Sequence, residues 1–537
     1  MSPTRTPLEP SSTPCAEWRL LSVRPAARPV KRSAWAGPTR LFRPRGVPDS
    51  LHIMLLPDQP EPVRSGPVAT QGVLSALRHE PFFAALAGLE GHEGSGDWRA
   101  TVAGLVTLRL VDRRTARIED RAPGGLDSAR PDGLTTDLPP DVIEAARQAV
   151  GDVDRQHAVA GPLRELLRSV TAAVADDLPQ RVLAYGHALH ADSRWSLAAD
   201  VYRAVLRLAE APRRTDPSTS VTFVPLAYDR LGHSLRMVGD LDGASAAYAA
   251  GRAAARALGD GDADRLIRIS EAKILIHLGN LPAAAAALDT VIQDAKAAKS
   301  IAPTDLSPAI AEKLSGIDDG DERLDVVALA QHDRAVVASL QHDFNFAAEQ
   351  YFAAWRAYRD PVRRERVWVD LAGNFAEMGL REVAREALLP LYANAHRRDI
   401  RLIAATNLLE LAVLDGREDL FETYRRTLHD AADAGTLPSD TAAKFALYEG
   451  RGEARFGRPS AAVAAFERAL TLAARHRVNE VAIRTDEALA ALAALRTGRP
   501  VADWFAPLTP TSMSPSVERI TRVVRRARRR AEAPRHE

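Results

Sequence analysis

From residue 180 onward, small and large apolar residues recur at a fixed helical spacing. A glycine or alanine is followed 12 residues later by an alanine, and 4 residues after that by an aromatic ring or a leucine. Residues three or four apart share one face of a helix, so the pattern predicts antiparallel helix pairs that cross at their small residues. We expect the larger residue to fill the wedge between neighbouring pairs. The spacing fits Gly186/Ala198/Tyr202, Gly232/Ala244/Tyr248, Ala272/Ala284/Leu288, Ala335/Ala347/Tyr351, Ala372/Ala384/Leu388 and Gly450/Ala462/Phe466.

Glycines mark the expected turns between the paired helices. A helix often ends at a residue in the left-handed conformation, which glycine adopts without steric cost. A further pair around residues 400–430 carries Phe421 where the second small residue is expected, and a lone helix at 479–496 is expected to cap the stack. The turn glycines are Gly239, Gly279, Gly379, Gly416 and Gly457.

The rest of the chain divides by composition. Residues 1–67 are rich in Pro, Arg and Ser and are expected to be disordered, and Met54 is an alternative start to Met1. Residues 68–175 are expected to be helical in pieces, with Asp97 and Asp141 as N-caps. Residues 498–537 are expected to form a linker and a basic helix, and residues 300–322 an excursion from the repeats.

The unit at residues 226–254 carries a resemblance to the tetratricopeptide repeat (TPR) family. Leu231, Gly232, Leu235, Gly239, Ala244 and Tyr248 fall where that family's pattern puts them, and the resemblance covers residues 176–497. Turn glycines lie 40, 37 and 41 residues apart, against about 34 in the family, so longer helices or turns are implied. The resemblance implies an all-α, right-handed helical solenoid, and bacterial proteins of this family often serve as adaptors.

Charge separates the ends of the chain from its body. The net charge is +1, yet residues 1–50 carry +6 and residues 518–537 carry +5, which leaves −10 for the 467 residues between. An acidic body argues against nucleic-acid binding by the repeats. The single cysteine, Cys15, excludes an internal disulfide, and no apolar run reaches the ~18 residues of a membrane span, so a cytoplasmic location is expected.

Sequence motifs of catalysis are missing. The chain has no phosphate-binding loop, no dinucleotide fingerprint, no HExxH and no GxSxG. His187 and His190 form an i,i+3 pair without an evident third metal ligand. We therefore expect neither an enzyme nor a bound metal or cofactor.

The resemblance also implies which side chains line a concave groove, since the family uses fixed offsets from the first small residue. These positions are rich in His, Lys and Arg, which would suit an acidic or carboxylate-ended peptide. Because histidine changes charge between about pH 5 and 8, such a partner would bind more tightly at pH 6 than at pH 7.5. The expected groove residues are His187, His190, His233, Arg236, Lys273, His277, His332, Arg366, Arg451 and Arg455.

Two functions remain open from the sequence. The first is a protein–protein interaction scaffold or adaptor that holds a protein or peptide in this groove. The alternative is a transcriptional or signalling regulator whose residues 68–175 bind nucleic acid, with residues 104–117 as the candidate recognition helix. The basic amphipathic segment 517–531 could dock on the body, lie on a membrane or track nucleic acid, and docking is favoured.

Overall fold

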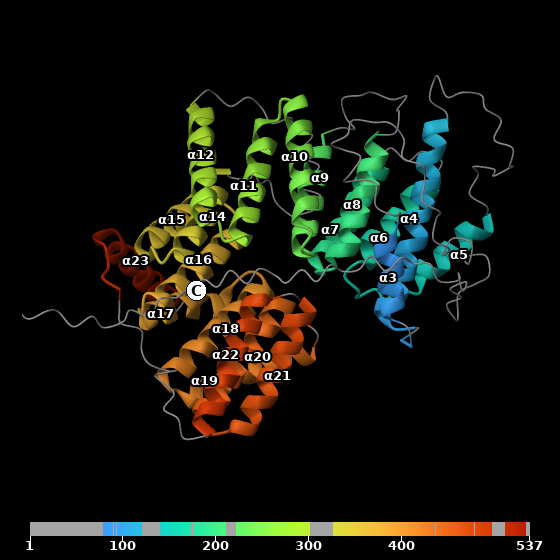
Figure 1. The fold of residues 1–537 in the computed structure, drawn as a ribbon. Helices are drawn as coiled ribbons and strands as arrows, with labels where there is room; N and C mark the ends of the chain where they lie inside the picture. Colours follow the sequence, from blue (N-terminus) through green and yellow to red (C-terminus); the bar gives the residue numbers. More distant parts are fainter. Residues whose placement is uncertain are drawn as a thin grey trace, which may run out of the picture. The chain divides into compact units, whose positions relative to one another are not determined.

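The computed structural model describes residues 79–89, 91–92, 94–120, 140–172, 177–210, 222–300, 326–434, 436–476, 478–496 and 511–532. All regular structure in these residues is α-helical, and consecutive helices pack against each other (Figure 1). The expected all-α helical repeat is therefore confirmed. The expectations for residues 1–67, for residues 301–322 of the excursion and for residues 498–510 of the linker lie outside the described residues.

In the described residues before the repeats there are four helices, namely α3 (Glu80–Gly88), α4 (Gly96–Asp120), α5 (Pro140–Gly151) and α6 (Ala160–Thr171). Two expected caps are wrong. The Ser95 hydroxyl, not Asp97, accepts a hydrogen bond from the first turn of α4, and Asp141 lies inside α5 because Pro140 begins that helix. Residues 104–117 continue α4 without a preceding turn, and their leucines are buried against α5 and α6.

In the part of residues 177–496 that the structure describes, the repeats form seven helix pairs and a final helix. Figure 1 shows the pairs in chain order. The first pairs are α7 (Leu178–Ala191) with α8 (Trp195–Glu210), α9 (Val224–Met237) with α10 (Leu241–Ala257), α11 (Gly261–His277) with α12 (Leu281–Ser300), and α14 (Val326–Leu340) with α15 (Phe344–Ala357). The others are α16 (Pro361–Glu377) with α17 (Arg381–Asn394), α18 (Arg398–Asp415) with α19 (Glu418–Asp433), and α20 (Ser439–Arg455) with α21 (Pro459–His476), followed by α22 (Asn479–Arg496).

The turns inside the pairs use left-handed residues as expected. All five predicted turn glycines have φ between 68° and 85°. In two pairs a non-glycine residue takes this conformation instead: Ser193 has φ 58° and His342 has φ 60°. The α7–α8 and α14–α15 turns therefore have the same left-handed backbone conformation as the glycine turns. Ser193 and His342 adopt it at a steric cost, because their Cβ atoms crowd the backbone and glycine has none.

The aromatic rings of the repeat pattern pack on glycines of their own pair. A Cβ on Gly232 would lie 2.5 Å from the Tyr248 ring, and one on Gly450 2.5 Å from the Phe466 ring. Each of these rings therefore occupies the space left by the missing side chain of the facing glycine. Phe421 is fully buried, and its ring lies against Gly452 of the following pair.

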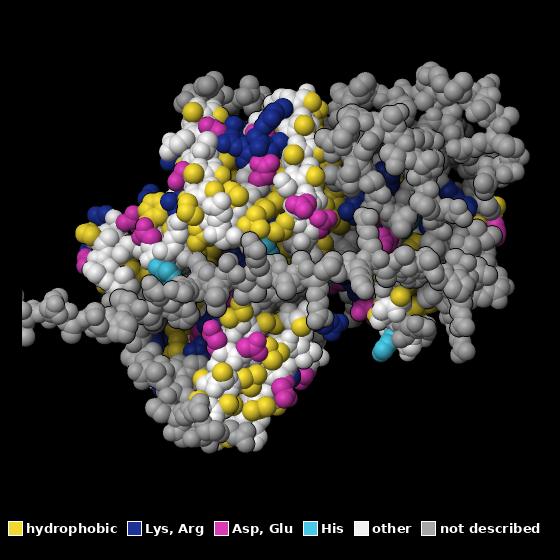
Figure 2. Space-filling view, viewed as in Figure 1, with side chains coloured by type: hydrophobic (Ala, Val, Ile, Leu, Met, Phe, Trp, Pro, Cys, Tyr) yellow, Lys and Arg dark blue, Asp and Glu magenta, His cyan; other side chains and the backbone are white. Residues whose placement is uncertain are grey.

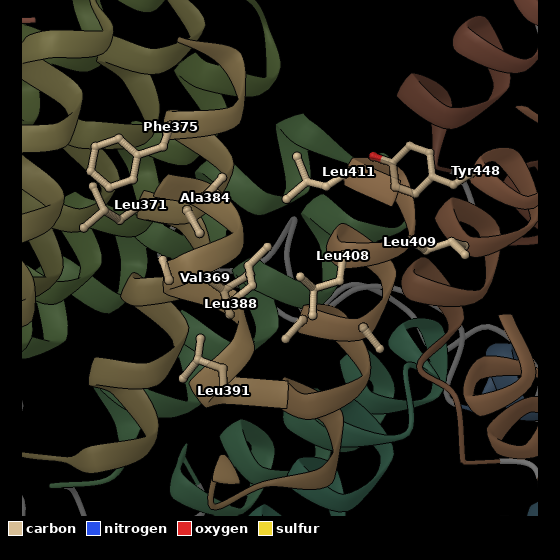
Figure 3. Close-up of a cluster of buried hydrophobic side chains, with 14 of the residues drawn as sticks. Val369, Leu371, Phe375, Ala384, Leu388, Leu391, Leu408, Leu409, Leu411 and Tyr448 are labelled. Carbon is tan, nitrogen blue, oxygen red and sulfur yellow. The ribbon is translucent and has the colours of Figure 1, made fainter. Parts of the chain in front are cut away.

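A continuous apolar core joins the later repeats. Figure 3 shows side chains of α16, α17 and α18 meeting, among them Phe375, Leu388 and Leu408, with Tyr448 of α20 beyond them. The last described helix, α23 (Pro515–Glu532), contacts α15 and α17, which confirms the docking interpretation. Among the described residues, no helix is both long and apolar enough to cross a membrane.

Candidate partner-binding site on the first helices

The first helices of successive pairs lie against one another. We call the series α7, α9, α11, α14, α16, α18, α20 and α22 the first-helix row. Direct packing joins α9 to α11, α11 to α14, α16 to α18, α18 to α20 and α20 to α22, whereas successive second helices of the described pairs share no comparable contact. Side chains from neighbouring repeats therefore meet on this row.

Polar and aromatic contacts join several neighbouring helices of the row. The rings of His190 and His233 lie 4.5 Å apart and join α7 to α9. Lys273 Nζ lies 3.1 Å from an Asp333 oxygen, and His332 Nε2 lies 2.7 Å from Asp370 Oδ2. Glu410 of α18 accepts from Arg451 at 3.4 Å and from Arg484 at 3.2 Å. Six helices of the row, α11, α14, α16, α18, α20 and α22, therefore contribute charged side chains to contacts between repeats.

The expected groove residues do not form one uniform basic surface. His187, His190, His233 and Arg236 come together where α7 meets α9. Lys273, His332 and Arg451 are engaged with carboxylates. His277 and Arg366 are exposed on α11 and α16, and Arg455 is half-buried near Gly416. The row therefore has a basic end at α7–α9, while its middle and far end are largely charge-balanced.

Three of the histidines are neutral at physiological pH. Burial lowers the pKa of His187 and of His190 to about 3, helped by the positive charge of Arg230. Burial lowers the pKa of His233 to about 2, with His190 and Arg236 adding to the effect. The expectation that these three side chains gain charge between pH 8 and 5 is wrong, because their rings are packed against Trp195, Tyr202 and one another.

Arg230 is the centre of this basic end. Within the described residues its guanidinium has no ion pair, and its Nε is buried without a hydrogen-bond partner. Four neighbouring polar atoms are also buried without one, and each such atom costs roughly 1–3 kcal/mol unless water or a ligand satisfies it. They are His187 Nε2, His190 Nδ1, Tyr202 Oη and Asp229 Oδ1. We call these five residues the Arg230 cluster.

The sequence pattern did not predict Arg230 because this residue lies two positions before the small residue Gly232, outside the family offsets. Two of the expected groove residues, Arg236 and Lys273, are half-buried: Arg236 bonds to Tyr248, and Lys273 pairs with Asp333. Substitution of either by glutamate would therefore disturb packing as well as charge.

A second basic patch is already neutralised. Figure 2 shows Lys and Arg side chains gathered between α10 and α12, with acidic side chains beside them. Arg252 of α10 pairs with Asp264 and Glu271 of α11 at 3.1 and 2.9 Å, and Arg268 of α11 pairs with Asp294 of α12 at 2.6 Å. This patch therefore offers less free positive charge than the Arg230 cluster.

A buried ionic cluster fixes the start of the repeats. His79 is completely buried and bonds to Asp200 and to Asp112, both at 2.8 Å. Burial alone would lower its pKa, but the two carboxylates outweigh it and raise the pKa to about 9. The imidazolium joins α3 to α4 and α8, which gives it a structural role. No signal in the sequence pairs these distant residues.

Among the described residues, no group of three or more His, Cys, Asp or Glu could hold a metal ion. The chain matches no protein-family model, and no curated protein is significantly similar to it in sequence.

Proposed function

We propose that this protein is a TPR-type interaction scaffold, acting as a bacterial cytoplasmic adaptor, that binds a segment of a partner protein along the first-helix row. The observation that carries the proposal is the Arg230 cluster, in which the half-buried Arg230 guanidinium forms no ion pair with a described residue. The cluster lies at one end of the first-helix row. A ligand with an anionic hydrogen-bond acceptor would bind such a site favourably, because it would pair with the half-buried cation.

The partner segment places an acidic group at the α7–α9 end. Arg230 and Arg236 supply the positive charge, and the neutral His187, His190 and Tyr202 supply ring nitrogen and hydroxyl groups. Along the rest of the row the charges are balanced, so the remainder of the segment carries neutral or mixed side chains. Binding weakens with salt, since surface charges are screened over ~8 Å at physiological ionic strength. It is nearly independent of pH between 7.5 and 6, since His187, His190 and His233 stay neutral there.

The experiment selects displayed random peptides on the wild-type protein and measures the affinity of a selected acidic peptide by fluorescence anisotropy. Arg230→Gln is expected to weaken binding roughly 10-fold or more, because a charge-assisted hydrogen bond contributes about 1.5–3 kcal/mol. Arg256→Gln, which removes the same charge from the exposed face of α10, is the control and should change the affinity less than twofold.

Thermal melts of both variants establish that the fold is retained. Selected peptides that lack acidic residues, or that bind Arg230→Gln as tightly as the wild type, would contradict the proposal.

A further inference from the structure

Helix α23 has two opposite faces. Val517, Ile520 and Val524 are buried, and they pack into the same apolar core as α15 and α17 (Figure 1). The other face carries exposed arginines: Arg519, Arg522, Arg526 and Arg529. We call these four residues the arginine stripe.

The stripe is held in a fixed position. Thr511 N donates to Met378 O at 2.9 Å, and the Asn345 side chain bonds to Ser512 O and Ser514 N, both at 2.9 Å. At the side of the helix, Arg525 Nε lies 3.2 Å from Glu386. The helix is thus anchored at its start and along its length, so a ligand would not have to order it.

The stripe concentrates positive charge on one side of the helix. At 100° per residue its four arginines fall within an arc of about 80°, and they extend over about 15 Å. None of them forms an ion pair with a described residue. Arg519 donates to the Ser516 hydroxyl and Arg522 to the Glu518 carbonyl, both neutral acceptors. Four guanidiniums therefore remain available to an external anion.

We propose that the arginine stripe binds the phosphate backbone of a nucleic-acid duplex without sequence preference. Insertion into a membrane needs an exposed apolar face, but that face of α23 is covered by α15 and α17. A protein partner needs apolar or aromatic anchors at the centre of the contact, and the stripe has none. The regularly spaced phosphates of a duplex can be bound by cations alone, without apolar anchors. Each arginine can donate two parallel hydrogen bonds to one phosphate. The site lies outside the repeats and is independent of the Arg230 cluster.

The salt dependence measures the number of phosphates contacted. Neutralising four phosphates gives log K a slope of about −3.6 against log salt, so affinity falls about 150-fold between 50 and 200 mM salt. Arg522→Gln/Arg526→Gln removes two contacts. Its slope should be about −1.8, and the same salt change should weaken its binding only about 12-fold.

The experiment measures fluorescence anisotropy of two unrelated labelled 20-base-pair duplexes with the full chain. We expect both duplexes to bind equally within a few-fold and the double variant to show the smaller slope. Arg401→Gln/Arg475→Gln removes two exposed arginines from other helices and should keep the wild-type slope.

Equal slopes for the double variant and the control would overturn the proposal, as would no binding at 50 mM salt. Polyglutamate that displaces the duplex at equal charge concentration would assign the stripe to an acidic protein. Binding to anionic phospholipid vesicles that the double variant abolishes, without duplex binding, would assign it to a membrane surface.

Discussion

Gly232→Leu is expected to lower the free energy of unfolding by about 3 kcal/mol or more. A Cβ at this position would lie 2.5 Å from one Tyr248 ring atom and 2.6 Å from another, and Tyr248 is itself almost fully buried. Neither the ring nor the helix can move without disturbing the α9–α10 crossing. Urea denaturation followed by circular dichroism measures the change. Ala244→Leu, at the same crossing, is expected to destabilise the protein for the same reason, since Ala244 is completely buried.

A matched pair of alanine substitutions separates this packing effect from helix propensity. Gly232→Ala should destabilise the protein, whereas Gly373→Ala in α16 should stabilise it by up to about 1 kcal/mol, because nothing lies within 4 Å of a Cβ there. If both alanine variants shift the urea midpoint in the same direction, the assigned packing of rings on glycines is incorrect.

Stability is expected to fall on both sides of about pH 6.5, for two different reasons. On the acid side, His187, His190 and His233 have folded-state pKa values of about 3, 3 and 2. Below pH 6.5 the unfolded chain takes up protons at these positions and the folded chain does not, so the free energy of unfolding decreases as pH falls. At pH 5 the loss is roughly 2 kcal/mol per histidine, or about 4–6 kcal/mol together.

Above pH 6.5 the free energy of unfolding is expected to decrease because of His79. Its folded-state pKa is about 9, so its stabilising contribution is fully present below the unfolded value of 6.5 and is lost as pH rises through 9. The total loss is about 3 kcal/mol. Urea midpoints measured from pH 4.5 to 9.5 test both sides.

Substitutions test whether His187, His190 and His233 cause the loss of stability in acid. His233→Phe keeps an aromatic ring beside Trp195 and removes one titrating group, so it should reduce the loss between pH 6.5 and 5 by about 2 kcal/mol. Tyr202→Phe removes a hydroxyl from the ring that packs against His187 and His190, and it should retain the wild-type pH dependence. A flat wild-type profile from pH 6.5 to 5 would show that these imidazoles are solvated.

The sequence predicted what depends on local spacing. Pairs such as Gly232 with Ala244 located the helix crossings, and left-handed glycines such as Gly279 located the turns, because both are set by residues close in the chain. The amphipathic pattern of α23 predicted a docked helix for a similar reason. Its apolar stripe repeats every three to four residues.

What the sequence could not predict depends on contacts between distant residues. His79 bonds to Asp200, which lies 121 positions away in the sequence, and the Phe421 ring packs against Gly452 in the next repeat. The histidines of α7 and α9 were identified correctly as neighbours on the first helices, but their burial, which keeps them neutral, follows from packing with Trp195 and Tyr202. Arg230 is a candidate binding residue because it forms no ion pair with a described residue, and this depends on which side chains surround it in the fold.

The central claim is that a partner segment lies along the first-helix row, and site-specific cross-linking tests it most directly. A photoreactive residue is placed at the exposed His277 on α11, and in a second protein at the exposed Gln293 on α12, outside the row. A selected acidic peptide is then irradiated with each protein at equal saturation. Cross-linking to position 277 and not to position 293 is the predicted result. Equal cross-linking at both positions, or cross-linking confined to position 293, would contradict the account.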